Sequence, residues 1–132
     1  MSEINNLIFP KLSYTIVGIC FSTHNELGRY CKEKQYSNLL DQKFKEIKIP
    51  YKRELSISNS GNILDFLIDN KVILEVKAKR VITKEDYVQL QRYLQETKIK
   101  LGIIVNFRDK YLKPMRVIRI DTENKKRFQK NN

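Results

Sequence analysis

Two carboxylates and an ammonium group interrupt the most apolar part of this chain. Residues 62–79, NILDFLIDNKVILEVKAK, consist mainly of Ile, Leu, Val and Phe, yet they include Asp65, Glu75 and Lys77. Neighbouring carboxylates repel each other unless a proton or a cation neutralises them. Mg²⁺ takes one or two protein carboxylates and keeps several waters for a phosphate substrate. These residue types therefore favour a divalent-metal site, and the alternative is an exposed face with ordinary salt bridges.

Alternation along residues 62–79 predicts a β-hairpin with two different faces, because successive residues of a strand point in opposite directions. The even positions are all apolar: Leu64, Phe66, Ile68, Val72, Leu74, Val76 and Ala78. The charged residues lie at odd positions, where Ile63, Leu67 and Ile73 accompany them. We therefore expect a continuous core surface on the even face and a helix that partly covers the odd face.

The length of the hairpin loop decides which residues face each other. Directly opposed residues share a face, so keeping the even residues together requires a loop with an odd number of residues. A three-residue loop at 69–71 would place Asp65 opposite Glu75, with Cβ atoms about 5 Å apart. A two-residue turn would set Asp65 against Leu74 and mix the faces unless a bulge repaired the register. The apolar pattern favours the three-residue loop and hence a meeting of the two carboxylates.

Two helices are expected before the hairpin. The first is a short buried helix at 13–23 that Ser13 could cap. The second runs from about residue 30 to 47 and ends before Pro50. Its apolar stripe, at helical spacing, consists of Tyr36, Leu40, Phe44 and Ile47.

Further elements on both sides of the hairpin complete the expected fold. A strand at 51–58 and a turn at 59–62 precede the hairpin. Thr83 and Asp86 resemble a capping box that opens a helix ending near Lys98. Its apolar side consists of Tyr87, Leu90 and Leu94. Strands at 101–107 and 115–120 follow, and the order ααβββαββ predicts an α/β sandwich with a mixed sheet.

The charge of the chain points to a polyanionic partner. The formal net charge is +11, and residues 98–132 carry eleven Lys/Arg against three Asp/Glu. A basic surface concentrates polyanions, so nucleic acid is the leading class of partner, and the alternative is that the charge serves solubility alone. Residues 121–132 should form a basic, flexible tail.

Other classes of protein are excluded by what the chain lacks. The longest apolar run has eight residues, whereas a membrane helix needs roughly 20. We find no signal-peptide pattern and expect a cytoplasmic protein without a membrane partner. Two cysteines and one histidine cannot build a four-ligand zinc site, so Cys20 and Cys31 are interpreted as reduced, mostly buried thiols.

The motif D-x9-E-x-K, formed by Asp65, Glu75 and Lys77, resembles the core of the PD-(D/E)xK nuclease superfamily. Further segments resemble, in this order, its GxxExxY family: HNELG (24–28), Glu33 and Tyr36, ILEVKA (73–78), Gln89 and Tyr93 in QLQRYL, and LGIIVNF (101–107) with Arg116 after it. The resemblance covers about residues 13–120. It implies one nuclease-like domain over residues 1–120 with a restriction-endonuclease-like core. Tyr30 stands where the motif would begin with glycine, and Leu64 replaces the proline before Asp65.

The resemblance implies a role for each acidic and basic motif residue. Asp65 and Glu75 would bind Mg²⁺, or Mn²⁺ in its place, with the Val76 carbonyl as a further ligand. Lys77 would orient the attacking water or stabilise charge on the phosphate. Glu33, in line with the packed side of its helix, would be an outer or additional metal contact, and the alternative is that its stem serves packing.

The remaining candidate residues would contact the lysine or the substrate. Gln89 and Tyr93 are four residues apart and share a helix face; by resemblance, Gln89 would hold the lysine or a phosphate. Tyr93 would border the substrate strand, and the alternative is core packing with its hydroxyl at the rim. Candidate phosphate contacts are Lys79, Lys113, Arg116 and Arg119.

Together these features predict an enzyme, a Mg²⁺-dependent nuclease that hydrolyses phosphodiester bonds in nucleic acid, with DNA as the expected substrate. The resemblance implies products with a 3′-hydroxyl and a 5′-phosphate. Two alternatives stay open. One is a non-catalytic nucleic-acid-binding module with the same fold, and the other is a subunit of a homodimer or of a larger DNA-processing assembly.

Overall fold

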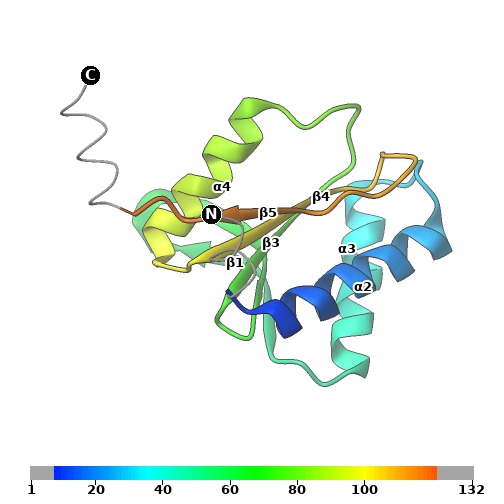
Figure 1. The fold of residues 1–132 in the computed structure, drawn as a ribbon, viewed down its shortest axis with the longest axis horizontal. Helices are drawn as coiled ribbons and strands as arrows, with labels where there is room; N and C mark the ends of the chain where they lie inside the picture. Colours follow the sequence, from blue (N-terminus) through cyan, green and yellow to red (C-terminus); the bar gives the residue numbers. More distant parts are fainter. Residues whose placement is uncertain (1–7, 122–132) are drawn as a thin grey trace.

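A five-stranded mixed sheet with helices on both faces forms the body of the protein (Figure 1). The computed structural model describes residues 8–121. The elements are α2 (Pro10–Leu27), α3 (Glu33–Glu46), β1 (Tyr51–Ile57), a 3₁₀ turn (Ser58–Ser60), β2 (Asn62–Ile68), β3 (Val72–Lys77), α4 (Lys84–Thr97), β4 (Leu101–Asn106) and β5 (Met115–Ile118). The predicted order ααβββαββ and the predicted restriction-endonuclease-like fold class are confirmed.

The strands lie in the order β1-β2-β3-β4-β5. Three of the four neighbouring pairs are antiparallel, and β3 and β4 are parallel. A parallel pair needs a crossover connection, which α4 supplies. Consequently the carboxyl ends of β3 and β4 meet at the same edge of the sheet, next to the beginning of α4 (Figure 1).

The helices differ from the expectations at their ends. Pro10 occupies the beginning of α2, where its fixed φ and missing N–H fit the first turn. Ser13 therefore lies inside the helix and is buried, and its predicted capping role is wrong. Helix α3 begins at Glu33 and ends at Glu46. Its predicted stripe is buried except for Ile47, which lies just beyond the helix and is exposed.

The hairpin has the predicted three-residue loop. The opposed pairs are Phe66 with Leu74, Leu67 with Ile73, and Ile68 with Val72, which leaves residues 69–71 as the connection. Asp69 and Asn70 both adopt φ 53, a left-handed conformation that short polar side chains tolerate. The register therefore carries Asp65 across from Glu75, as the apolar pattern predicted.

The predicted continuity of the even face is wrong at Leu64. This residue packs on the α4 side of the sheet, whereas Phe66 packs on the side of α2 and α3. The β1–β2 register brings Glu54 across from Asp65, and Glu54 has a φ of 51. This left-handed residue interrupts the regular pleat, and an interrupted pleat exchanges the faces of the residues beyond it.

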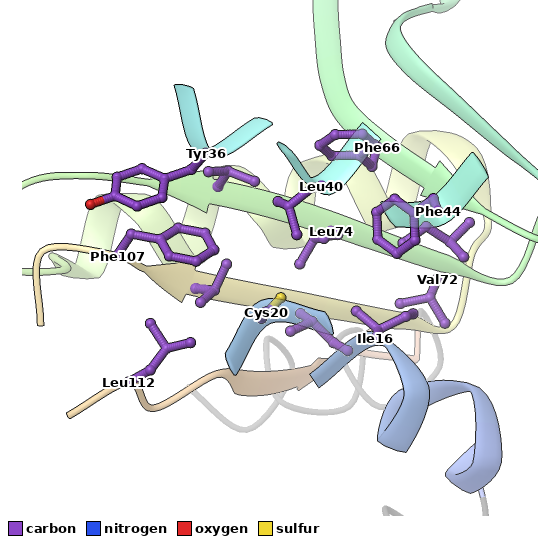
Figure 2. Packing of buried hydrophobic residues seen from close by; sticks show 14 of the residues in the cluster. Ile16, Cys20, Tyr36, Leu40, Phe44, Phe66, Val72, Leu74, Phe107 and Leu112 are labelled. Atoms are coloured by element: carbon purple, nitrogen blue, oxygen red, sulfur yellow. The ribbon is translucent and has the colours of Figure 1, made fainter. Parts of the chain in front are cut away.

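Each face of the sheet has its own core. The larger core lies under α2 and α3, where the Tyr36 ring stacks on Phe107 with centroids 4.3 Å apart (Figure 2). The second core lies under α4, which covers Leu67 and Ile73 as predicted for the odd face. Ile63, expected beside them, is 52% exposed and corrects that prediction, because it lies beyond the interrupted pleat.

The remaining global expectations concern cysteines, membranes and the tail. Cys20 and Cys31 are both free, and burial raises the pKa of Cys20 to about 12. Within residues 8–121, each helix is too short or too polar to cross a bilayer. The predicted basic tail falls, apart from Asp121, outside the described residues.

Close approach of α4 to β4 depends on Gly102. A Cβ atom at this position would lie 2.9 Å from both methyl carbons of the buried Leu90 side chain. Gly102→Ala should therefore lower the free energy of unfolding by about 1–3 kcal/mol, as overpacking of a core typically does. The measurement is urea denaturation of both proteins.

Gly18→Ala is the matched control for this prediction. Gly18 lies within α2, and a Cβ atom there would meet nothing within 4 Å. Alanine is favoured over glycine inside a helix by about 0.5–1 kcal/mol, so this variant should be slightly more stable than the wild type. Equal stability of the two variants would contradict close packing at Gly102.

Candidate active site

Asp65 and Glu75 meet where the β2–β3 ladder ends. The last paired residues are Phe66 and Leu74, and beyond them the carboxylates bind the backbone of the opposite strand. The Val76 N–H donates to Asp65 Oδ2 (2.8 Å), and the Asp65 N–H donates to Glu75 Oε1 (3.3 Å). Both carboxylates are thus directed into the space between the two strands, and their predicted convergence is confirmed.

Ionising Glu75 beside Asp65 is energetically unfavourable. Glu75 is only 4% exposed. Burial raises the pKa of Glu75 to about 9, with the negative charge of Asp65 as the next cause. Removing a carboxylate from water disfavours its charged form, and a second carboxylate nearby adds repulsion. A cation between them would offset both effects.

The donor set fits a hard divalent cation. Two carboxylates are the number that Mg²⁺ commonly takes from a protein. Within residues 8–121 no cluster of three or more His, Cys, Asp or Glu side chains could hold a metal. Glu33 therefore does not join Asp65 and Glu75 as a direct third ligand in this arrangement. Val76 lies next to them and is fully buried, with its N–H bound to Asp65.

Lys77 borders the carboxylates at the last position of β3. Its Nζ lies 3.4 Å from Gln89 Oε1 and 3.9 Å from Asp86 Oδ1. Both partners belong to α4, whose first turn packs above this edge of the sheet. The predicted contact between Gln89 and the lysine is confirmed, and it orients the ammonium group without neutralising it.

Asp86 is a residue of this site that sequence reasoning identified only as a helix cap. Its Oδ2 accepts hydrogen bonds from the N–H and hydroxyl of Thr83 and lies 2.5 Å from Lys79 Nζ. Burial alone would raise the pKa of Asp86, but the hydrogen bonds from Lys79 and Thr83 bring it below its usual value. One signal was present in the sequence: Lys77 and Lys79 are spaced like two residues on one face of a strand, although β3 ends at Lys77.

Asn106 is a second residue that was missed. This buried side chain at the end of β4 donates from Nδ2 to the Lys79 carbonyl (2.7 Å) and accepts from the Lys79 N–H (3.0 Å). The Phe107 N–H donates to the Lys77 carbonyl (2.8 Å). These bonds fix the backbone that follows Lys77. A buried amide in the apolar run LGIIVNF was the available signal, because buried polar groups need partners.

Tyr93 packs in the core, which is one of the two alternatives considered for it. The ring is buried in the core under α4 with Leu90 and Leu94. Burial raises the pKa of the Tyr93 hydroxyl, and the charges of Glu75 and Asp65 raise it further. The hydroxyl therefore lies within electrostatic range of the carboxylates, and contact with a substrate strand stays a prediction.

Glu33 lies at the rim of the site. It is the first residue of α3, one turn before the buried Tyr36, and it is exposed, so it lies at the end of the packed stripe and outside the core. Partial burial raises the pKa of Glu33, followed by the charge of Asp65, whereas Lys77 and Lys79 lower it. These influences place Glu33 near the site, where an outer contact to a bound cation stays a prediction.

The predicted phosphate contacts are dispersed. Lys79 is paired with Asp86 beside the site, and the exposed Lys113 lies in the loop after β4 at the same edge of the sheet. Arg116 Nη2 instead donates to the Ile8 carbonyl on the α2 side. Arg119 is bonded to Lys100 before β4, four residues from Ile104, which pairs with Glu75, and so lies about 13 Å from the carboxylates along the strand at about 3.3 Å per residue. Of the four, the structure thus places only Lys79 beside the site, whereas Lys113 lies at the same edge of the sheet but next to β5.

A comparison with protein families identifies the class to which this fold belongs. The family model of the PD-(D/E)XK nuclease superfamily matches residues 10–120, and the chain belongs to this superfamily. Its nucleases typically use divalent metals and act on nucleic acid. A search of curated proteins finds no match.

The buried Glu75 carboxyl predicts how the free energy of unfolding changes with pH in the absence of divalent ions. Between its ordinary pKa of 4.5 and its folded value of about 9, Glu75 keeps a proton in the folded state alone. The free energy of unfolding should therefore fall as pH rises through this range, by at most about 1.4 kcal/mol per pH unit from this group. In Glu75→Gln this contribution should disappear, leaving the variant the more stable protein at pH 8.

The measurement is urea denaturation in EDTA at several pH values between 5 and 9. A glutamine amide keeps an oxygen that can accept the Asp65 N–H bond, so the variant removes the titrating group with little loss of structure. Glu46→Gln, at an exposed position at the end of α3, is the matched control and should follow the wild type. Parallel profiles for wild type and Glu75→Gln would contradict the prediction.

Proposed function

We propose that this protein is a Mg²⁺-dependent nuclease of the GxxExxY family that hydrolyses phosphodiester bonds in DNA. The observation that carries the proposal is the convergence of the Asp65 and Glu75 carboxylates, with the Lys77 ammonium group at their border. Superfamily membership supports nuclease activity in general. The net charge of +11 supports a polyanionic substrate.

Asp65 and Glu75 would hold the cation, with the Val76 carbonyl as a further ligand and Glu33 as an outer contact. Mn²⁺ could substitute for Mg²⁺ in this oxygen-rich environment. When bound, the divalent ion supplies Lewis acidity, which polarises phosphate oxygens and makes water more acidic. The burial of Glu75 supports this assignment, because a site with little water strengthens the attraction between carboxylates and a cation.

Lys77 would complement the negative charge that develops on the phosphate. An ammonium group contributes most when the protein fixes it before the reaction begins. Gln89 and Asp86 supply that fixation from α4, and Asn106 supplies it through the backbone after the lysine. Asp86 also pairs with Lys79, so its negative charge is shared between two lysines. The proposed products carry a 3′-hydroxyl and a 5′-phosphate.

A second candidate function is binding of nucleic acid without cleavage. Tyr30 favours it, because this residue stands at the position where the GxxExxY motif would have glycine. Salt-dependent DNA binding that Asp65→Asn leaves unchanged, together with no cleavage in Mg²⁺ or Mn²⁺, would support this candidate over the nuclease.

Cleavage of plasmid DNA tests the proposed function. The wild type should nick DNA in Mg²⁺ or Mn²⁺ and be inactive in EDTA. Asp65→Asn and Lys77→Ala should each lower kcat/KM by about 100-fold or more, the usual effect of removing a charged group that stabilises a transition state.

The same hairpin offers matched controls for both variants. Asp69 and Lys71 lie in its loop, at the far end from the site, and form an ion pair with each other (3.3 Å). Asparagine tolerates the positive φ of Asp69. Asp69→Asn and Lys71→Ala should therefore cleave like the wild type. If Asp65→Asn and Lys77→Ala also do so, the proposed site is not catalytic.

A further inference from the structure

Two loops that are distant in sequence are joined beside the candidate site. The Arg29 Nε donates to the Arg108 carbonyl (2.8 Å), and the Arg108 Nε donates to the Arg29 carbonyl (2.9 Å). Next to this reciprocal pair, His24 Nε2 lies 2.8 Å from the Asp109 carbonyl. The loop between α2 and α3 and the loop after β4 therefore form one surface, and Figure 1 shows them side by side.

Tyr30 projects from this surface beside the two arginines. The centroid of its ring lies 5.1 Å from Arg29 Cζ and 5.7 Å from Arg108 Cζ. Tyr30 is 76% exposed, so it contributes little to a core. Tyr14 is similarly exposed at 83%, but within residues 8–121 no cation lies over its ring. We name Arg29, Tyr30 and Arg108 the tyrosine–arginine platform.

The positive charge of the platform is not neutralised by the described part of the chain. Among residues 8–121, no carboxylate forms a salt bridge with Arg29 or Arg108. A second cation–aromatic pair lies further along the loop after β4, where Lys110 Nζ is 5.5 Å from the ring centroid of Tyr111, itself 72% exposed. Exposed rings interleaved with cations are typical of surfaces that bind single-stranded nucleic acid.

The platform is connected to the candidate site through Phe107 and Glu33. Arg108 follows Phe107, whose N–H donates to the Lys77 carbonyl. On the other loop, Tyr30 precedes Glu33 by three residues, and Glu33 is within electrostatic range of Asp65 and Lys77. The platform and the carboxylates therefore lie near the same edge of the sheet.

We infer that the tyrosine–arginine platform stacks an unpaired base and holds the adjoining phosphate of a single-stranded segment of nucleic acid. Bases within a duplex already stack on each other, whereas an unpaired base offers its face to an aromatic ring. Guanidinium groups beside the ring suit the phosphate, because they donate paired hydrogen bonds to its oxygens. The inference rests on the proposed function, in that the strand leads to the site of cleavage.

Fluorescence anisotropy in EDTA tests this inference without requiring cleavage. The probes are a short labelled oligo-dT and a blunt duplex of the same length. Tyr30→Ala should weaken oligo-dT binding by about 5- to 20-fold and duplex binding by less than about twofold, because stacking contributes only to the unpaired strand. Tyr30→Phe should bind both probes like the wild type, since it keeps the ring face.

Two further variants separate stacking from charge. Arg108→Gln should reduce the slope of log affinity against log salt for oligo-dT by about 0.7, the value for one phosphate contact, while Tyr30→Ala leaves the slope unchanged. Tyr14→Ala removes an exposed ring elsewhere and should bind oligo-dT like the wild type. Thermal denaturation of each variant shows whether the fold is kept.

The outcomes separate this inference from the proposed function. Unchanged oligo-dT affinity in a folded Tyr30→Ala variant, or an equal loss for oligo-dT and duplex, overturns the platform even if the wild type cleaves DNA. A selective loss in Tyr30→Ala supports the platform even if no preparation cleaves DNA, in which case the proposed nuclease fails alone. Lys77→Ala keeps the platform, so in this variant a further Tyr30→Ala change should again weaken binding of oligo-dT more than binding of the duplex.

Discussion

The hydrogen bonds that Asp65 and Glu75 accept across the end of the hairpin join the fold to the site. Where β2 and β3 separate, the N–H groups of Val76 and Asp65 bind carboxylate oxygens, and a buried N–H without a partner would be costly. Glu75 is almost fully buried, and the charge of the half-buried Asp65 adds to the cost of ionising it. The hydrogen bonding of the hairpin is thus completed by two carboxylates that destabilise the folded state when both are charged. A bound cation would offset their repulsion.

The lysine beside the carboxylates depends on how closely α4 approaches the sheet. Gly102 lets the Leu90 side chain lie against the β4 backbone, and the next residue toward the start of α4, Gln89, reaches Lys77. Asn106 fixes the same lysine's strand from the other side. The position of the Lys77 ammonium group therefore depends on four uncharged residues: Gly102, Leu90, Gln89 and Asn106. An ammonium group that is fixed in this way before a reaction is preorganised to stabilise negative charge.

Local patterns predicted the hairpin well and its surroundings less well. Parity of the apolar residues gave the register that opposes Asp65 and Glu75, because a one-residue slip would expose the whole core face. The same rule failed at Leu64, since the left-handed Glu54 on the neighbouring strand interrupts the pleat. Sequence signals marked Asp86 and Asn106 as polar residues in need of partners. Which partner each one meets depends on the loops that bring both to Lys79.

Charge and aromatic exposure would act at different stages of substrate selection. A net charge of +11 attracts single and double strands alike, because both are polyanions. The carboxylates with a cation would select a phosphodiester but not its strandedness. Discrimination needs a group that responds to the face of a base, and Tyr30, exposed beside two arginines, has that property. A glycine at this position would leave the basic surface intact but offer no ring, so this one residue links the chain's departure from the GxxExxY motif to the form of nucleic acid that it would prefer.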